Sequence, residues 1–160
     1  MKRASSNLLL LDVNVLLAIA WPNHQFHAAA IAALSGRKRW ATCALTQLGF
    51  IRLSSNPAAV ATAKSPQEAA SLLARLVADS AHLYLNSLPA PAAEDWRDVF
   101  GKVLGHQQVT DAYLVRLAAA NNAFLSLSTA DWRAPRETDR LSSSLAERGA
   151  IGSRFQRTPA

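Results

Sequence analysis

The sequence is short of cysteine and of long apolar runs. Cys43 is the only cysteine among 160 residues, so neither an internal disulfide nor a cysteine-based zinc site can form. Asp12 and Asn14 interrupt the apolar stretch that follows Met1-Lys2-Arg3, which argues against a signal peptide, and no run is long enough to span a bilayer. We therefore expect a cytoplasmic protein that has no membrane partner.

Several catalytic motifs are also missing. The chain has neither a Gly-x-Ser-x-Gly nucleophile motif nor a glycine-rich phosphate-binding loop. His24 and His27 lie three residues apart without a cysteine or a third histidine nearby, so we interpret them as surface or packing residues. The four tryptophans are interpreted as core or groove residues. Serine esterases, P-loop nucleotidases and zinc enzymes are thereby disfavoured.

Acidic residues are few relative to basic ones. The 17 lysines and arginines outnumber the 11 aspartates and glutamates, and the formal net charge is +6. This balance favours a polyanionic partner such as RNA or DNA, or an acidic protein, although a solvated basic surface would look the same. Half of the residues are hydrophobic, which is typical of a folded domain.

Short apolar segments alternate with helical patterns along the chain. Leu8 to Leu11 is too short for a helix and too apolar for an exposed strand, and Ser65-Pro66 is a typical helix start. The alternation predicts an α/β fold, with a short parallel sheet of four to five strands and helices on both faces. The expected strands are 8–11, 40–43, 82–85 and 123–127, and the expected helices are 13–20, 25–35, 45–54, 66–79, 94–104 and, capped by Thr110, 111–120.

The composition changes near the C-terminus. Residues 132–160 carry six arginines and three acidic residues with few clustered apolar side chains. We therefore expect one folded domain over residues 1–131 and a basic, partly mobile extension over 132–160.

Three aspartates are candidates for a metal site. Asp12 follows the first strand directly, Asp131 follows the last strand, and Asp111 lies in the first turn of a helix. The carboxyl ends of parallel strands share one edge of a sheet, and carboxylates gathered there repel one another unless a cation neutralises them. Oxygen ligands of this kind suit Mg²⁺ or Mn²⁺. Taken singly, Asp12 could only cap a helix, Asp111 could only complement a helix dipole, and Asp131 could lie in a turn.

Four segments, in this order and spacing, resemble PIN-domain ribonucleases. The likeness is closer still to the VapC-like toxins of type II (VapBC) toxin–antitoxin systems. It runs from about residue 7 to 131 and rests on Asp12-Val13-Asn14, Leu45 to Arg52 with Ser55-Asn56-Pro57, Thr110 to Tyr113, and Phe124 to Asp131.

The resemblance implies a PIN-like fold and an endoribonuclease that depends on Mg²⁺, with Mn²⁺ as a substitute. Asp12 and Asp111 would be the main metal ligands and Asp131 would complete the cluster, while Asn14 and Thr129 would orient a carboxylate, a water or a phosphate. It also implies structured RNA such as tRNA as the substrate, a VapB-like antitoxin as the partner, and a homodimer. An Ala/Leu-rich helix such as 66–79 could serve as the dimer interface.

The sequence departs from the family at two places. Many PIN domains have a glutamate where this chain has Gln47, and the segment 149–152 is a poor substitute for the usual final strand. The first departure motivates an alternative, a non-catalytic PIN-like module that binds RNA or protein. A third reading, a phosphotransferase of the haloacid-dehalogenase type, is disfavoured because that family needs Asp-x-Asp where this chain has Asp12-Val13-Asn14.

Overall fold

The computed structural model describes residues 8–35, 39–88, 90–106 and 108–126. Within these ranges four parallel strands form one sheet in the order β3-β2-β1-β4. The strands are β1 (Leu8–Leu11), β2 (Arg39–Cys43), β3 (His82–Leu85) and β4 (Phe124–Ser126). The helices are α1 (Val13–Ala20), α2 (His27–Ser35), α3 (Ala44–Ser54), α4 (Pro66–Val77), the 3-10 helix η1 (Glu94–Trp96), α5 (Arg97–Phe100) and α6 (Gln108–Ala120).

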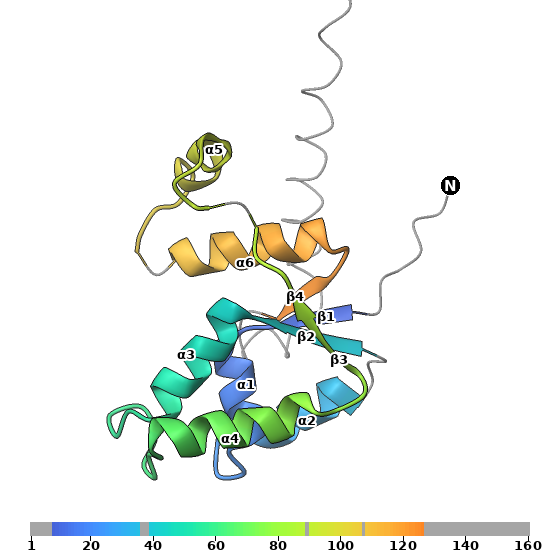
Figure 1. Cartoon of the computed structure of the whole chain (residues 1–160), viewed down its shortest axis with the longest axis vertical. Helices are drawn as coiled ribbons and strands as arrows, with labels where there is room; N and C mark the ends of the chain where they lie inside the picture. The colour runs from blue at the N-terminus through green and yellow to red at the C-terminus, as the bar shows by residue number, and fades with distance from the viewer. Residues whose placement is uncertain (1–7, 36–38, 89, 107, 127–160) are drawn as a thin grey trace, which may run out of the picture. The chain divides into compact units, whose positions relative to one another are not determined.

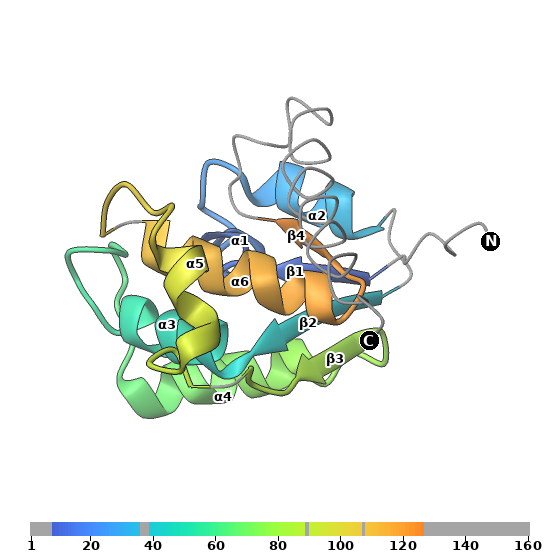
Figure 2. The ribbon, with the colours of Figure 1, turned by 90° about the horizontal axis from the view of Figure 1, so that it is seen from above.

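Helices cover both faces of this sheet, as the sequence predicts. Helix α6 lies on one face, and α1, α3 and α4 lie on the other (Figure 1). Seen from above, α6 runs along the sheet (Figure 2). Helix α5 lies on the side of α6 that faces away from the sheet (Figure 1). None of the helices in the described ranges is long and apolar enough to cross a membrane.

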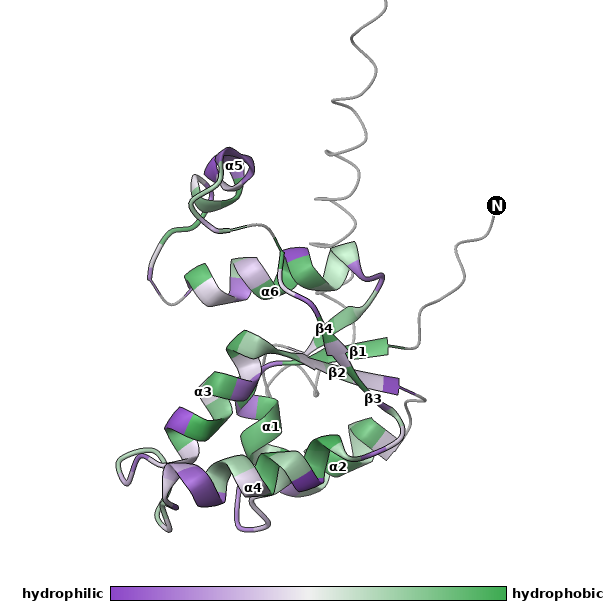
Figure 3. Cartoon of the chain, in the orientation of Figure 1, coloured by the Kyte–Doolittle hydropathy of each residue, from purple (hydrophilic) through white to green (hydrophobic). Residues whose placement is uncertain are grey.

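The side chains of β1 alternate between the two faces of the sheet and are buried on both. Leu10 packs with Leu114 and Leu117 of α6, and all three side chains are fully buried. Its neighbours Leu9 and Leu11 are also buried and, because side chains alternate along a strand, they belong to the opposite face. Both faces of β1 are therefore apolar, which explains why the strand is a plain run of leucines (Figure 3).

The start of α4 follows directly from its sequence. Ser65 Oγ accepts a hydrogen bond from the Glu68 backbone N–H at 3.2 Å, and Glu68 Oε2 accepts one from the Ser65 N–H at 2.8 Å. Pro66 occupies the first helical turn, where its missing N–H costs nothing. The predicted helix start at Ser65-Pro66 is confirmed, and the helix ends at Val77.

Two of the predicted helices are wrong in extent. The helix expected over 94–104 is only η1 and α5, because Phe100 is the last helical residue and Gly101, a poor helix former, follows it. The helix expected to start after a Thr110 cap begins instead at Gln108. Gln108 Oε1 accepts a hydrogen bond from the Leu104 N–H at 3.0 Å, so the chain turns into the helix earlier.

Candidate active site

Asp12 stands at the carboxyl end of β1, where strand passes into helix. Its backbone N–H donates to the Ser126 carbonyl at 3.0 Å, which continues the pairing of β1 with β4. Its Oδ2 caps α1, accepting hydrogen bonds from the Asn14 N–H at 3.4 Å and from Asn14 Nδ2 at 3.0 Å. Only 5% of Asp12 is exposed, so these bonds hold a buried carboxylate in one orientation.

Burial dominates the electrostatics of Asp12. Loss of hydration raises the pKa of its carboxyl group, and the hydrogen bonds from Val13 and Asn14 lower it only in part. The negative charge of Asp111 raises the pKa of Asp12 further. The two carboxylates, about a hundred residues apart in the chain, therefore act on each other at one site.

Asp111 reaches this site from the first turn of α6. It is half-buried, and burial raises the pKa of its carboxyl group. Within the described ranges no hydrogen bond or ion pair engages it. A helix N-terminus stabilises a carboxylate only modestly, so two such groups that repel each other favour a bound cation. The oxygen donors of Asp12 and Asp111 fit a divalent metal ion.

Gln47 lies near the same edge, in the first turns of α3. Helix α3 starts directly after β2, and β2 is the neighbour of β1. The helix also packs closely on α1, since a β-carbon at Gly49 would lie 3.2 Å from Val13 Cγ2. Gln47 Nε2 donates to Thr42 Oγ1 at 2.9 Å. This position thus holds a neutral amide that is engaged by a buried hydroxyl.

The remaining predicted site residues, Asp131 and Thr129, lie outside the described residues. Within the part of the chain that the structure describes, no group of three or more histidine, cysteine, aspartate or glutamate side chains could hold a metal. The structure therefore brings together two carboxylates, Asp12 and Asp111, with Asn14 beside the first. The contribution of Asp131 and Thr129 stays a prediction.

Two residues near the site had no role in the sequence analysis. Thr42 lies in β2, one residue before its end, with no exposed surface, and its hydroxyl lies 2.8 Å from Nε2 of His82 on β3. The signal was available in principle, because a threonine between the apolar residues of a buried strand requires a hydrogen-bond partner. The identity of that partner depended on the register between β2 and β3.

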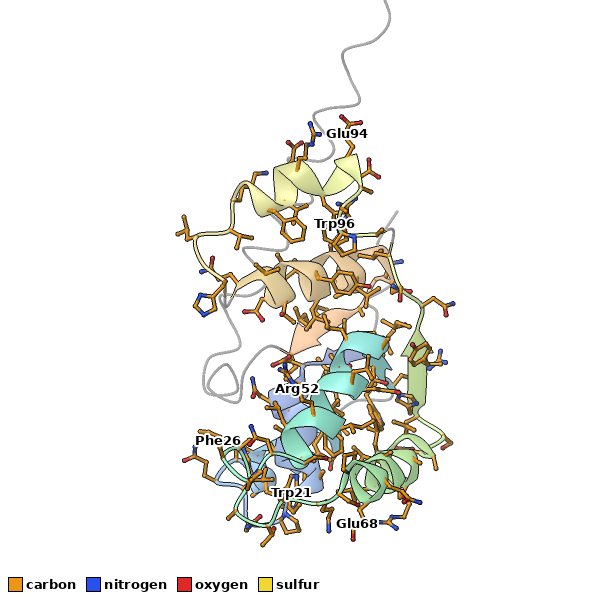
Figure 4. All side chains as sticks on the ribbon, turned by 60° about the vertical axis from the view of Figure 1, so that its left-hand side comes forward. Trp21, Phe26, Arg52, Glu68, Glu94 and Trp96 are labelled. Atoms are coloured by element: carbon orange, nitrogen blue, oxygen red, sulfur yellow. The ribbon has the colours of Figure 1, made fainter. Side chains whose placement is uncertain are left out.

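His24, before α2, and His27, the first residue of α2, make local hydrogen bonds, which agrees with their interpretation as packing residues. His27 Nδ1 lies 2.8 Å from the Ala18 carbonyl, and His24 Nδ1 accepts a hydrogen bond from the Phe26 N–H at 3.2 Å. Figure 4 shows the labelled Trp21 and Phe26 in this region and Trp96 packed toward α6. Trp21, Trp40 and Trp96 are buried, which confirms the core interpretation for these three, while Trp132 lies outside the described residues.

The raised pKa of Asp12 predicts a stability cost at neutral pH. The folded protein binds the Asp12 proton more tightly than the unfolded chain does, so the free energy of unfolding falls as pH rises from the ordinary aspartate pKa to the raised folded value. Above that value the cost is complete. Asp12→Asn keeps the helix cap but carries no charge. It should stabilise the metal-free protein by about 1 kcal/mol at neutral pH, or about 2–4 °C in Tm.

Thermal unfolding between pH 3 and pH 8 in the presence of a chelator measures this effect. The stabilisation should vanish near the acidic end, where both states are protonated. Asp79→Asn is the control of opposite sign, because hydrogen bonds from Ala81 and Trp40 lower the pKa of Asp79. A lower Tm for Asp12→Asn than for the wild type at neutral pH would contradict the prediction.

Comparison with known proteins places this geometry in a family. The PIN domain family matches residues 9–141. Ribonuclease VapC39 of Mycobacterium tuberculosis (strain ATCC 25618 / H37Rv) is 38% identical over 115 residues, which cover 69% of this chain and 80% of the relative. Ribonuclease VapC38 of the same strain is 38% identical over 115 residues, covering 68% of this chain and 76% of the relative.

A third VapC ribonuclease is similar to this chain to nearly the same degree. Ribonuclease VapC44 of the same organism is 37% identical over 115 residues, which cover 71% of this chain and 80% of the relative. The parallel four-stranded sheet, the helices on both faces and the Asp12–Asp111 pair are in accord with these matches. The chain belongs to the PIN-domain family and, within it, to the group of VapC ribonucleases.

Proposed function

We propose that this protein is the toxin of a type II toxin–antitoxin system of the VapBC kind and acts as a metal-dependent endoribonuclease. The observation that carries the proposal is the pair of carboxylates, Asp12 and Asp111, in a VapC-related chain: burial raises the pKa of both, and the charge of Asp111 raises that of Asp12 further. RNA phosphodiester bonds are the substrate class that the names of the relatives suggest. The net charge of +6 suits such a polyanion.

Each described residue of the site has a specific task in this proposal. A bound divalent metal would lower the pKa of a water molecule and offset the charge that develops on the phosphate. Asp12, of which 5% is exposed, and the half-buried Asp111 would hold that ion. Asn14 holds the Asp12 carboxylate at Oδ2 through its Nδ2–H, which would orient that carboxylate toward the metal.

The proposal also names the metal ion, two further site residues outside the described ranges, the partners and the RNA target. We assign Mg²⁺ as the physiological ion with Mn²⁺ as a substitute, Asp131 as a third ligand, and Thr129 as an orienting residue. The partners are a VapB-like antitoxin that silences the enzyme and a second copy of the chain in a homodimer, and the protein would act in the cytoplasm. Structured RNA such as tRNA is the proposed target.

The test is cleavage of structured RNA by the purified full-length chain. We expect strand scission in the presence of Mg²⁺ or Mn²⁺ and its disappearance after EDTA treatment, with recovery when the metal is restored. Denaturing electrophoresis of end-labelled tRNA measures the products.

The alternative, a binding module without catalysis, makes the opposite prediction for the wild type. A wild-type chain that binds RNA without cleaving it, together with a Gln47→Glu variant that gains both metal affinity and cleavage, would favour the module. Cleavage by the wild type eliminates it.

A further inference from the structure

Arg52 is an exposed cation in the last turn of α3. In the ranges that the structure describes, no ion pair or hydrogen bond engages its guanidinium. Arg116 on α6 shows the opposite case, because it covers the ring of Trp96 and donates to the Asp95 carbonyl. A cation at a helix C-terminus stabilises the helix only modestly. The Arg52 guanidinium, with five N–H donors in a rigid plane, is therefore available to a ligand.

The packing of α3 on α1 determines which way Arg52 faces. A β-carbon at Gly49 would lie 3.2 Å from Val13 Cγ2, so the Gly49 side of α3 faces the first residue of α1. Arg52 follows Gly49 by three residues, which places it about 60° away around the helix and about 4.5 Å further along the axis. It lies where α3 passes α1 (Figure 4). Because Val13 directly follows Asp12, this side of α3 is turned toward the Asp12 end of α1.

The side chain of Arg52 is directed back along α3 toward the sheet. Side chains on a helix lean toward its N-terminus and cover the preceding turn. The N-terminus of α3 follows β2 directly, so it lies at the carboxyl edge of the sheet, where Asp12 follows β1. In the turn that Arg52 covers, Leu48 is 66% exposed and offers a surface to the apolar stem of the arginine. The charged head therefore stays in water on the side of α3 that leads to the carboxylate site.

We propose that Arg52 binds a backbone phosphate of the RNA strand, next to the phosphate that is cleaved at Asp12 and Asp111. This inference rests on the proposed function, since the RNA substrate belongs to it. The cation held by the two carboxylates serves the scissile phosphate, while the neighbouring phosphates keep their charge and attract a cation of the protein. A guanidinium can donate to two phosphate oxygens at once, so Arg52 would fix the position of the strand without reading its bases.

Fluorescence anisotropy of labelled tRNA with the full-length chain tests the proposal, in EDTA so that no cleavage occurs. Arg52→Gln should weaken tRNA binding about tenfold at low salt. It should also reduce the slope of log Kd against log salt concentration by about one, the value for one lost phosphate contact. Arg52→Lys keeps the charge without the planar fork, so it should retain the slope and lose less affinity. Calorimetric titration with Mn²⁺ should give wild-type affinity for both variants, because Arg52 is not a metal ligand.

Arg75→Gln is the matched control. Arg75 is also exposed and also lies in the last turn of a helix, α4, so its substitution removes the same charge and the same interaction with a helix dipole. Its tRNA affinity and salt slope should stay close to those of the wild type. Equal effects of Arg52→Gln and Arg75→Gln would show that Arg52 contributes only to the general charge, and the phosphate contact would be wrong.

The outcomes separate this inference from the proposed function. Cleavage of tRNA by the wild type in Mg²⁺ decides the nuclease assignment by itself, whatever the anisotropy shows for Arg52. A wild type that binds tRNA without cleaving it, with the expected slope change in Arg52→Gln, removes the nuclease and leaves the phosphate contact. A wild type that cleaves tRNA while Arg52→Gln binds it with unchanged affinity and slope removes the contact and leaves the nuclease.

Discussion

Asp12→Asn and Asp111→Asn are each expected to reduce RNA cleavage by about 10²- to 10³-fold while the fold is retained. Each substitution replaces a charged oxygen of the carboxylate pair by an amide of the same shape, so the electrostatic attraction for a divalent ion is lost without a cavity. The buried Asp12 should have the larger effect, because only 5% of it is exposed and solvent cannot take over its role.

Rates of tRNA cleavage under single-turnover conditions in Mg²⁺ measure this loss, and circular dichroism checks the fold. Glu68→Gln is the matched control, because it also removes one carboxylate charge but lies on α4, where a glutamine can still complete the capping box. Its cleavage rate should equal that of the wild type. Wild-type rates in both aspartate variants would refute the metal-dependent mechanism at this pair.

The second large effect, on stability, is expected from substitution of Trp96, whose side chain packs η1 and α5 against α6. Only 1% of Trp96 is exposed, and its ring stacks on Tyr113 of α6 at a centroid distance of 5.5 Å. The Arg116 guanidinium lies 4.5 Å from the centre of the ring, and its Nη1 donates to the Asp95 carbonyl at 2.7 Å. Trp96→Ala removes all the ring contacts at once. It should lower the free energy of unfolding by about 3–5 kcal/mol.

Chemical denaturation with two-state analysis measures this change, and Tm should fall by roughly 10 °C. Trp96→Phe preserves an aromatic ring against Tyr113 and should cost less than half as much. Hydrogen exchange adds a local readout, because residues 94–100 pack mainly against α6 and should lose protection first. A change below about 1 kcal/mol for Trp96→Ala would show that the aromatic stack contributes little to stability.

The sequence patterns predicted the structure correctly where the residues of one segment determine its conformation. The run Leu8 to Leu11 forms β1, with Leu9 to Leu11 buried, and Ser65 caps α4 with Glu68 as its partner. The predictions failed at two helix ends, each set by local contacts between residues four apart that the apolar pattern does not reveal. Trp96 and Phe100 complete their packing before Gly101, so α5 ends early, and Gln108 binds the Leu104 backbone, so α6 starts before Thr110.

The sequence by itself determined the parallel α/β class, the position of Asp12 at the end of a buried strand and the place of Asp111 in the first turn of a helix. These properties follow from apolar patterning and helix-end chemistry, which act within a few residues. Only the tertiary structure decided that Asp12 and Asp111 act on each other, and that Gln47 reaches His82 through Thr42. Both depend on the strand order β3-β2-β1-β4, because it brings together elements that are distant in the chain.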